Sequence, residues 1–535
     1  MGSAKHFTGI EFFREGVAKG EIVAFSEKKY FNNIKKEKIL SMLEILQESR
    51  FDEIERFVDT LRPLDIYIGD KSMISMFLFS RIDIFGFIED IKLEEEMLYN
   101  LKEDFLKYIE MSIEKNENKD YILSEEQNVQ LKKTCLQFAN ELLDNLTRRK
   151  LADVLKSNSE NIILYVNELT IQHFDYLPDN LTAIIFSKSK LDEKFIGYIS
   201  NDFLVPIVKT NVEFKNGDNV IIDGFSSHII VDPTEEDIIK ANKLLNDHTF
   251  TAGEKAPFEP TKILFFSPIN GTYNIEKILS PGWYNGAGLV KTEYLYYTKG
   301  RIPSKAEIYD YFFEIFTKFK DQEIHLSLPD FREEKPVDYL DDITIDIPTC
   351  LRNSDLFSNL FDSLAFASRD VGVNPRIYVP YIRIEEEIEF WQNKIENTFD
   401  YHDVLMPEVC IALETETAYQ NYLDYDYCKF TVINLDSLLE EVTDYYDRFS
   451  EISVEEFMKI FVPQIRDIHQ HYRKRHYVTK HIVKGNCLSN PDIFYKMLKM
   501  GFYNFSIPHD RMRLVIAPME KFKKSYIRWV RLPKE

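Results

Sequence analysis

Apolar residues in the first third of the chain recur at intervals of three and four positions. Ile39, Met42 and Leu43 begin one such series, and the same spacing returns over Leu131–Leu146. This is the period of an amphipathic helix, so we expect a helical subdomain over residues 35–155. Helices of this kind form either a bundle core or a docking surface, and the pattern leaves both open.

After about residue 160 the pattern changes to short β-branched runs separated by turn residues, which is typical of strands. These runs stand at Ile162–Val166, Ala183–Phe186, Val205–Val208 and Val220–Asp223. They predict a compact β/α domain over residues 156–250.

An alternating run that ends at Phe25 predicts one more strand within residues 1–34. Further on, Thr234 stands at the position of a helix N-cap. Asp237 follows three residues later, as in a capping box, so we expect a helix to begin just after Thr234.

Beyond a linker at Gly253–Pro260, strand-like runs alternate with helical stretches. The runs are Ile263–Phe266, Ile324–Leu328, Ile377–Pro380, Val409–Leu413, Phe430–Ile433 and Tyr503–Ile507. This alternation fits a (β/α)8 TIM barrel, whose catalytic groups lie at the C-terminal ends of the strands. We therefore predict a multidomain α/β chain with its barrel over residues 251–535.

The charge balance narrows the classes of partner. The chain has 66 Lys and Arg against 89 Asp and Glu, a net charge of −23. This excess of acid argues against binding nucleic acid or an anionic membrane surface, and it suits either solubility or a neutral or basic protein partner.

Cysteine usage and hydropathy indicate the compartment. The five cysteines form no close metal-type pair, which suggests reduced thiols. The most apolar run, Met73–Ile88, contains charges and is shorter than the ~18 apolar residues of a spanning helix. No secretory signal is visible, so we expect a cytoplasmic protein without membrane insertion.

The segment from Asn285 to Tyr297 resembles the "GIGLYRTEFLY" signature of Enzyme I, the phosphoenolpyruvate-protein phosphotransferase of the sugar phosphotransferase system. Residues 218–237 resemble a second segment of that family, and further matches follow in order along the chain. The resemblance implies a phosphohistidine-type β/α domain with an inserted helical bundle, followed by a phosphoenolpyruvate-binding barrel. It also implies a homodimer and docking of the histidine phosphocarrier protein.

Several residues depart from the family pattern. Lys291 stands at the arginine that grips the substrate phosphate, and Ser327 at a second clamp arginine. Phe195 stands at the phospho-acceptor histidine, and a phenyl ring cannot accept phosphate. Lys484 stands at the proton-donating cysteine. Cys487, three residues on, either replaces that cysteine after a loop shift or packs as a small buried apolar residue.

Other positions keep the family's chemistry. Glu414 and Asp436 align with two metal-binding carboxylates, and the resemblance therefore implies a Mg²⁺ site. The alternative is that both are solvated strand ends. Arg448 aligns with a substrate-binding arginine and would act with Lys291, whereas Leu435 replaces a family asparagine.

None of the remaining histidines aligns with the phospho-acceptor position of the family. His471, His476 and His481 lie among several lysines and arginines. This cluster predicts either an anion site or an exposed helix end.

Three functions remain open at this level. The first is a catalytically impaired Enzyme I-like protein that binds the phosphocarrier protein, a sibling Enzyme I or a metabolite, and regulates sugar transport. The second is a diverged enzyme that still binds phosphoenolpyruvate or another small carboxylate. The third is a homodimeric scaffold.

Overall fold

The computed structural model describes residues 4–25, 148–248, 263–331, 354–421, 430–442, 452–474 and 480–515, with short gaps at 9, 15, 149–150, 159, 175, 204, 272–274, 276–278, 280–282, 300–301 and 510. The helical subdomain expected over residues 35–155 lies almost entirely outside the described residues. So does Arg448.

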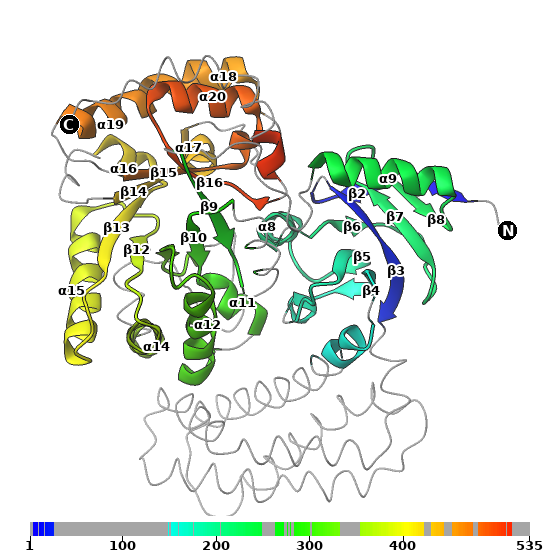
Figure 1. The fold of residues 1–535 in the computed structure, drawn as a ribbon, viewed down its shortest axis with the longest axis horizontal. Coiled ribbons are helices and arrows are strands. Elements are labelled where there is room, and N and C mark those ends of the chain that lie inside the picture. Colours follow the sequence, from blue (N-terminus) through cyan, green and yellow to red (C-terminus); the bar gives the residue numbers. More distant parts are fainter. Residues whose placement is uncertain are drawn as a thin grey trace, which may run out of the picture.

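The described N-terminal part forms one mixed sheet (Figure 1). Its strands are β1 (Lys5–Phe7), β2 (Glu11–Phe12), β3 (Val17–Phe25), β4 (Ile162–Leu169), β5 (Leu181–Ser189), β6 (Ile207–Lys209), β7 (Asn219–Asp223) and β8 (His228–Val231). Their order across the sheet is β1-β8-β7-β3-β4-β5-β6-β2. The four strands from β3 to β6 run parallel, and the outer ones pair antiparallel.

The two faces of this sheet bury different sets of side chains, because successive side chains of a strand point to opposite faces. Ile22, Ile163 and Ile185 pack into a core that is separate from the barrel and includes Phe214 of a loop. Val23 and Leu164, one position further along their strands, join the large hydrophobic cluster that continues into the C-terminal barrel. The sheet therefore shares a core with the barrel through one face.

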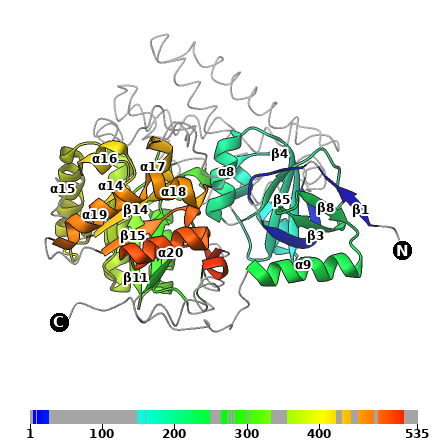
Figure 2. The same cartoon turned by 90° about the horizontal axis from the view of Figure 1, so that it is seen from above.

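Helix α9 (Glu235–His248) lies along the sheet in both views (Figures 1 and 2). Its first turn has the predicted capping box. The Asp237 N–H donates to Thr234 Oγ1 (3.3 Å), and the Thr234 N–H donates to Asp237 Oδ2 (3.0 Å). This local prediction from the sequence is confirmed.

The C-terminal part forms a closed barrel of parallel strands. The strands are β9 (Leu264–Ile269), β10 (Gly286–Lys291), β11 (Glu323–Ser327), β12 (Arg376–Val379), β13 (Glu408–Leu413), β14 (Phe430–Asn434), β15 (Lys480–Lys484) and β16 (Asn504–Ser506). The predicted TIM barrel is thereby confirmed, and with it the α/β fold class.

Helices follow most of these strands and surround the barrel (Figure 1). They are α11 (Glu293–Lys299), α12 (Lys305–Lys318), α14 (Ser354–Val371), α15 (Glu385–Tyr401), α16 (Glu416–Gln420), α17 (Leu435–Val442), α18 (Val454–Ile460), α19 (Val462–Lys474) and α20 (Pro491–Met500).

Two histidines of the barrel strands are buried, His325 inside the barrel and His481 between its strand and His469 of α19. His325 of β11 is buried and its Nδ1 lies 2.9 Å from the hydroxyl of Tyr378. His481 of β15 is buried beside Thr431, and burial, reinforced by the neighbouring His469, lowers the pKa of His481 to about 3. The sequence interpretation of His481 as part of an exposed basic helix end is therefore wrong, because the residue belongs to a barrel strand.

Candidate functional site

The C-terminal ends of β13, β14 and β15 bring three polar side chains together inside the barrel mouth. Glu414 follows β13 and is 4% exposed. Its Oε1 accepts a hydrogen bond from the Asn434 side-chain amide (2.6 Å) and lies 3.4 Å from Lys484 Nζ. The adjacent parallel strands hold these residues because Asn434 and Lys484 are opposite one another in the β14–β15 register.

Tyr381 closes the other side of this cluster. It follows β12, and its backbone N–H points to Glu414 Oε2 at 3.4 Å. Its hydroxyl donates to Ser437 Oγ (3.2 Å), and Ser437 Oγ also accepts from the Asn434 amide (2.7 Å). The carboxylate of Glu414 is thus surrounded by protein donors on both oxygens.

Tyr381 has a backbone φ of 51°, which non-glycine residues seldom adopt. Such a conformation costs about 1–3 kcal/mol and is found mostly where the surroundings of a functional site impose it. We regard it as evidence that this end of the barrel is a built site and not only a strand end.

Asp436 lies in the first turn of α17 and contacts the loop after β15. Its Oδ2 accepts the backbone N–H of Asn486 (2.7 Å). The intervening Gly485 has φ 152°, and a Cβ there would lie 3.2 Å from Asp436 Oδ1. A glycine is needed for the loop to approach the carboxylate this closely. Lys484 at the end of β15 and Asn486 in the loop that follows therefore contact the two predicted metal ligands, Glu414 and Asp436.

Cys487 lies in a short 3₁₀ turn of the same loop (Asn486–Ser489) and belongs to the large hydrophobic cluster. Burial raises the pKa of the Cys487 thiol well above its usual value, and the negative charge of Asp436 raises it further. Of the two alternatives for this residue, the geometry favours packing.

Lys291 lies at the end of β10, three strands away from β13 around the barrel. Its Nζ lies over the ring of Tyr294, 5.8 Å from the ring centroid. It is opposite Ser327 in the β10–β11 register, and the Ser327 carbonyl accepts from Thr292 Oγ1 (2.8 Å). Lys291 and the Glu414 cluster thus belong to different sectors of the mouth.

Phe195 lies in the first turn of α8 (Glu193–Phe203) and is 4% exposed. The Asp192 carboxylate caps this turn by accepting the N–H groups of Lys194 (2.8 Å) and Phe195 (3.3 Å). The Phe195 ring meets the ring of Tyr297 in α11 at 62°, with centroids 5.2 Å apart. The predicted acceptor position is therefore buried between the sheet domain and the barrel.

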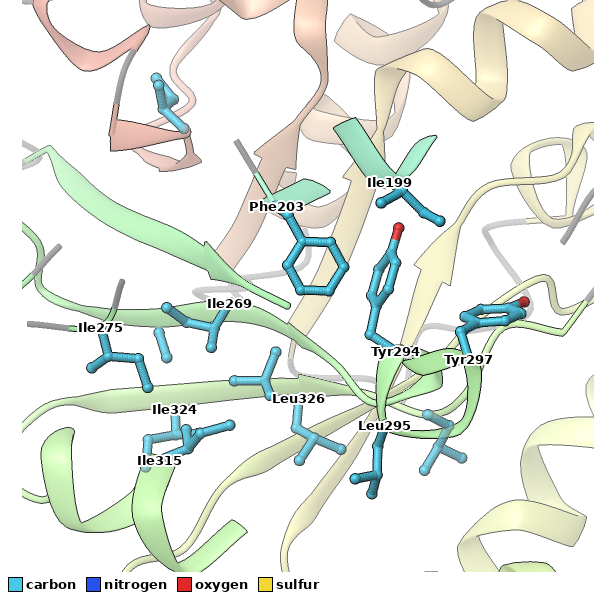
Figure 3. Close-up of a cluster of buried hydrophobic side chains, with 14 of the residues drawn as sticks. Ile199, Phe203, Ile269, Ile275, Tyr294, Leu295, Tyr297, Ile315, Ile324 and Leu326 are labelled. Atoms are coloured by element: carbon cyan, nitrogen blue, oxygen red, sulfur yellow. The ribbon is translucent and has the colours of Figure 1, made fainter. Parts of the chain in front are cut away.

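A wider apolar interface surrounds this contact. Figure 3 shows Ile199 and Phe203 of α8 facing Tyr294 of α11. Nearby, Phe174 stacks on Phe203 with centroids 6.3 Å apart, and the neighbouring His173 is buried. Burial lowers the pKa of His173 to about 4, so its imidazole is neutral at pH 7.

The sequence interpretation missed Asn434, Tyr381 and Ser437. Asn434 stands one residue before Leu435, the position at which the resemblance places the family asparagine. For Asn434, the signal in the sequence was that a polar residue stands at the end of a predicted strand. Nothing local in the sequence pointed to Tyr381, because its role depends on its backbone conformation.

Within the residues that the structure describes, no group of three or more His, Cys, Asp and Glu side chains is placed to hold a metal ion. Nor does any helix in the described ranges combine the length and the apolar character that crossing a membrane requires.

Comparison with curated proteins identifies the same relatives. The chain is 24% identical over 282 residues to the phosphoenolpyruvate-protein phosphotransferase of Priestia megaterium, a match that covers 45% of this chain and 47% of that protein. It is 27% identical over 221 residues to the enzyme of that name from Haloferax volcanii, which covers 38% of each. The chain thus spans about half the length of the curated relatives that it matches, or less. The resemblance to Enzyme I is confirmed, and the chain is Enzyme I-like.

Comparison with solved structures returns, among others, a solution structure of Enzyme I and a citrate lyase from Burkholderia xenovorans LB400. The first has 19% identity and a TM-score of 0.24, and covers 44% of this chain and 97% of that one. The second has 11% identity and a TM-score of 0.33, and covers 50% of this chain and 81% of that one. No family model matches the sequence.

Proposed function

We propose that this chain is an Enzyme I-like protein that does not carry phosphate on its sheet domain and that acts by binding, as a regulator of sugar transport. The observation that supports this proposal is the contact of Phe195 with Tyr297. In a phosphotransferase of this kind, the acceptor side chain must be a nucleophile and must reach the substrate. Phe195 is not a nucleophile, and its ring is buried against the barrel helix α11.

The barrel supports the same proposal. A phosphoryl transfer site needs cationic clamps that can stabilise charge on the transferred group. Lys484 is paired with Glu414, and Ser327 offers no positive charge. Lys291 provides a point charge in place of the planar fork of an arginine. With these substitutions, the barrel mouth has few cationic groups that could stabilise a phosphoryl group during its transfer.

The partners that we propose are a second copy of this chain, the histidine phosphocarrier protein and a sibling Enzyme I. Self-association is supported by apolar side chains at the C-terminal end of α15, where Tyr401 is 84% exposed and Leu405 is 74% exposed. A contiguous exposed apolar surface often marks an interaction site, and we propose that these two side chains form part of one.

The decisive experiment incubates the protein with labelled phosphoenolpyruvate and Mg²⁺ and then measures acid-labile phosphohistidine. An Enzyme I with its acceptor histidine serves as the positive control. We expect no label above that of a heat-denatured sample. Stoichiometric label on any histidine of this chain would refute the proposal.

A second candidate function is a diverged enzyme or receptor that binds a small carboxylate or phosphate at the barrel mouth. The buried network around Glu414 and the strained backbone at Tyr381 favour it. Calorimetry with phosphoenolpyruvate, oxalate and pyruvate tests this candidate. Heat that disappears in a Glu414→Gln, Asp436→Asn double variant would support it, and equal heat in both proteins would exclude it.

A further inference from the structure

Two observations at the barrel mouth concern the cation that the resemblance implies. Glu414, the first predicted metal ligand, accepts a hydrogen bond from the Asn434 amide on Oε1, and the same oxygen lies 3.4 Å from Lys484 Nζ. The Lys484 side chain is only 18% exposed and that of Glu414 only 5%. The carboxylate thus already has a positively charged partner inside the barrel.

We propose that the ammonium group of Lys484 takes the place of the divalent metal ion at this site, so that the barrel mouth is metal-independent. The inference goes beyond the proposed lack of phosphate transfer, because it concerns the metal requirement of the barrel mouth, in which the Phe195 contact has no part.

The number of lone pairs is not the reason that a metal does not fit. A carboxylate has about four acceptor sites, so Glu414 could in principle keep its hydrogen bonds and still coordinate an ion. The reason is charge. A Mg²⁺ ion bound to Oε1 at about 2.1 Å would stand at most about 5.5 Å from Lys484 Nζ, in a largely buried setting where repulsion between cations is poorly screened.

Asp436 reinforces this conclusion. Its Oδ2 accepts the Asn486 N–H at 2.7 Å, and its Oδ1 faces the close approach of Gly485. Mg²⁺ demands nearly octahedral geometry and usually keeps several water molecules. Asn486 of the loop after β15 thus contacts Asp436, and Lys484 at the end of β15 contacts Glu414, so each predicted ligand already has a partner from this part of the chain.

The lysine also explains why the buried carboxylate of Glu414 is tolerated in this sector. Without a cation, Glu414 would be a buried carboxylate with only neutral donors, which is costly. A covalently attached ammonium supplies the compensating charge permanently, whereas a metal would supply it only when bound. The arrangement therefore keeps the mouth assembled without a cofactor.

The test is titration of the full chain with Mn²⁺ alone, followed by the electron paramagnetic resonance signal of free Mn²⁺. We expect the native protein to show no saturable site that depends on Glu414. Replacing Lys484 by methionine removes the charge and keeps a chain of similar length. This variant should gain a saturable site for one Mn²⁺, which the native protein lacks, since Glu414 loses its internal cation.

Three further variants make the outcome specific. Lys484→Arg keeps the positive charge and should remain without a Mn²⁺ site. Adding Glu414→Gln to Lys484→Met should abolish the gain. Lys499→Met, the same substitution at an exposed lysine of α20, is the matched control and should behave as the native protein does.

Two results would overturn the proposal. One is a native protein that binds Mn²⁺ at a site lost in Glu414→Gln. The other is a folded Lys484→Met variant that gains no Mn²⁺ binding. If the methionine variant does not fold, Lys484→Gln is measured in its place. Phosphohistidine formation is measured separately, so failure here is distinct from failure of the proposed function.

Discussion

The ring of Phe203 in α8 meets the ring of Tyr294 in α11 edge to face, with centroids 5.0 Å apart and an angle of 77° between the ring planes. One ring belongs to the sheet domain and the other to the signature segment of the barrel. Edge-to-face pairs contribute about 0.5–1.5 kcal/mol beyond the burial of their surface. The two parts of the chain are therefore joined by specific aromatic contacts.

Truncation of Phe203 to alanine should lower the free energy of unfolding by about 3–5 kcal/mol, because a buried aromatic side chain leaves a cavity between the two parts. Chemical denaturation of the full chain measures this change. The matched control is Phe225→Ala, at a phenylalanine that is 38% exposed, for which we expect about 0.5 kcal/mol or less. Similar losses in the two variants would contradict an interface role for Phe203.

Gly286→Ala should disrupt the barrel. A Cβ at this position would lie 1.9 Å from the backbone carbonyl oxygen of Glu323 in the neighbouring strand, and backbone atoms cannot move aside cheaply. We expect a loss of more than about 3 kcal/mol, or an insoluble protein. Gly372→Ala is the control: its φ is +77°, but nothing lies within 4 Å of the added Cβ. Its expected cost is about 1 kcal/mol. Thermal unfolding compares the two, and an intact, equally stable Gly286→Ala protein would contradict the β10–β11 register.

Stability should fall in mild acid because of buried histidines. The folded pKa of His173 is about 4, below the usual 6.5, chiefly through burial. Between these values the unfolded chain binds a proton that the folded chain does not. The contribution of His173 to the free energy of unfolding is therefore present in full above pH 6.5, and it is lost as the pH falls toward 4. For His173 the loss is roughly 3 kcal/mol.

The substitution His173→Asn should reduce this pH dependence, since an amide oxygen still accepts from the Thr170 N–H (3.1 Å in the native chain) but does not titrate. Part of the dependence should remain because His481 contributes in the same direction. His228→Asn, at a partly exposed histidine of β8, is the control. Denaturant titrations at pH 7, 6, 5 and 4 measure the effect. An unchanged slope in His173→Asn would show that this histidine is not responsible.

Self-association predicts a mass of about twice the 63.3 kDa of the chain in light scattering at micromolar concentration. A stable dimer contact buries roughly 1,200–2,000 Å² in total. Changing Tyr401 and Leu405 to serine should shift the mass toward one chain if the end of α15 takes part. A native protein that is monomeric throughout would refute the homodimer.

The sequence predicted the barrel through six of its strands and did not identify β10 and β15. The reason differs between the two. In β10, Gly286 and Gly288 lower the strand signal, although the close approach of β11 requires a residue without a side chain at Gly286. In β15, His481 stands between lysines, so that a buried strand resembles the charged end of a helix.

The sequence predicted a residue of the site only where that residue aligned with a functional position of Enzyme I. Glu414 and Lys484 were identified separately, from two different segments, and nothing in either segment indicated that their charges meet. That contact depends on the register of β13, β14 and β15. The positive φ of Tyr381 is likewise set by tertiary packing, since neither Pro380 nor the residue itself favours it.

Strand β3 lies in the middle of the N-terminal sheet, between β4 on one side and β7 on the other. Its partners are made much later on the ribosome. At about 5–20 residues per second, the roughly 200 residues between the end of β3 and the start of β7 take about 10–40 s to synthesise. Until β4 (Ile162–Leu169) is synthesised, this nine-residue strand lacks both of its neighbours in the sheet, and the edge that pairs with β7 remains without its partner for the whole of that time. Such edges readily pair with other chains, so the yield of soluble protein should depend on the rate of translation and on chaperones that cover β3.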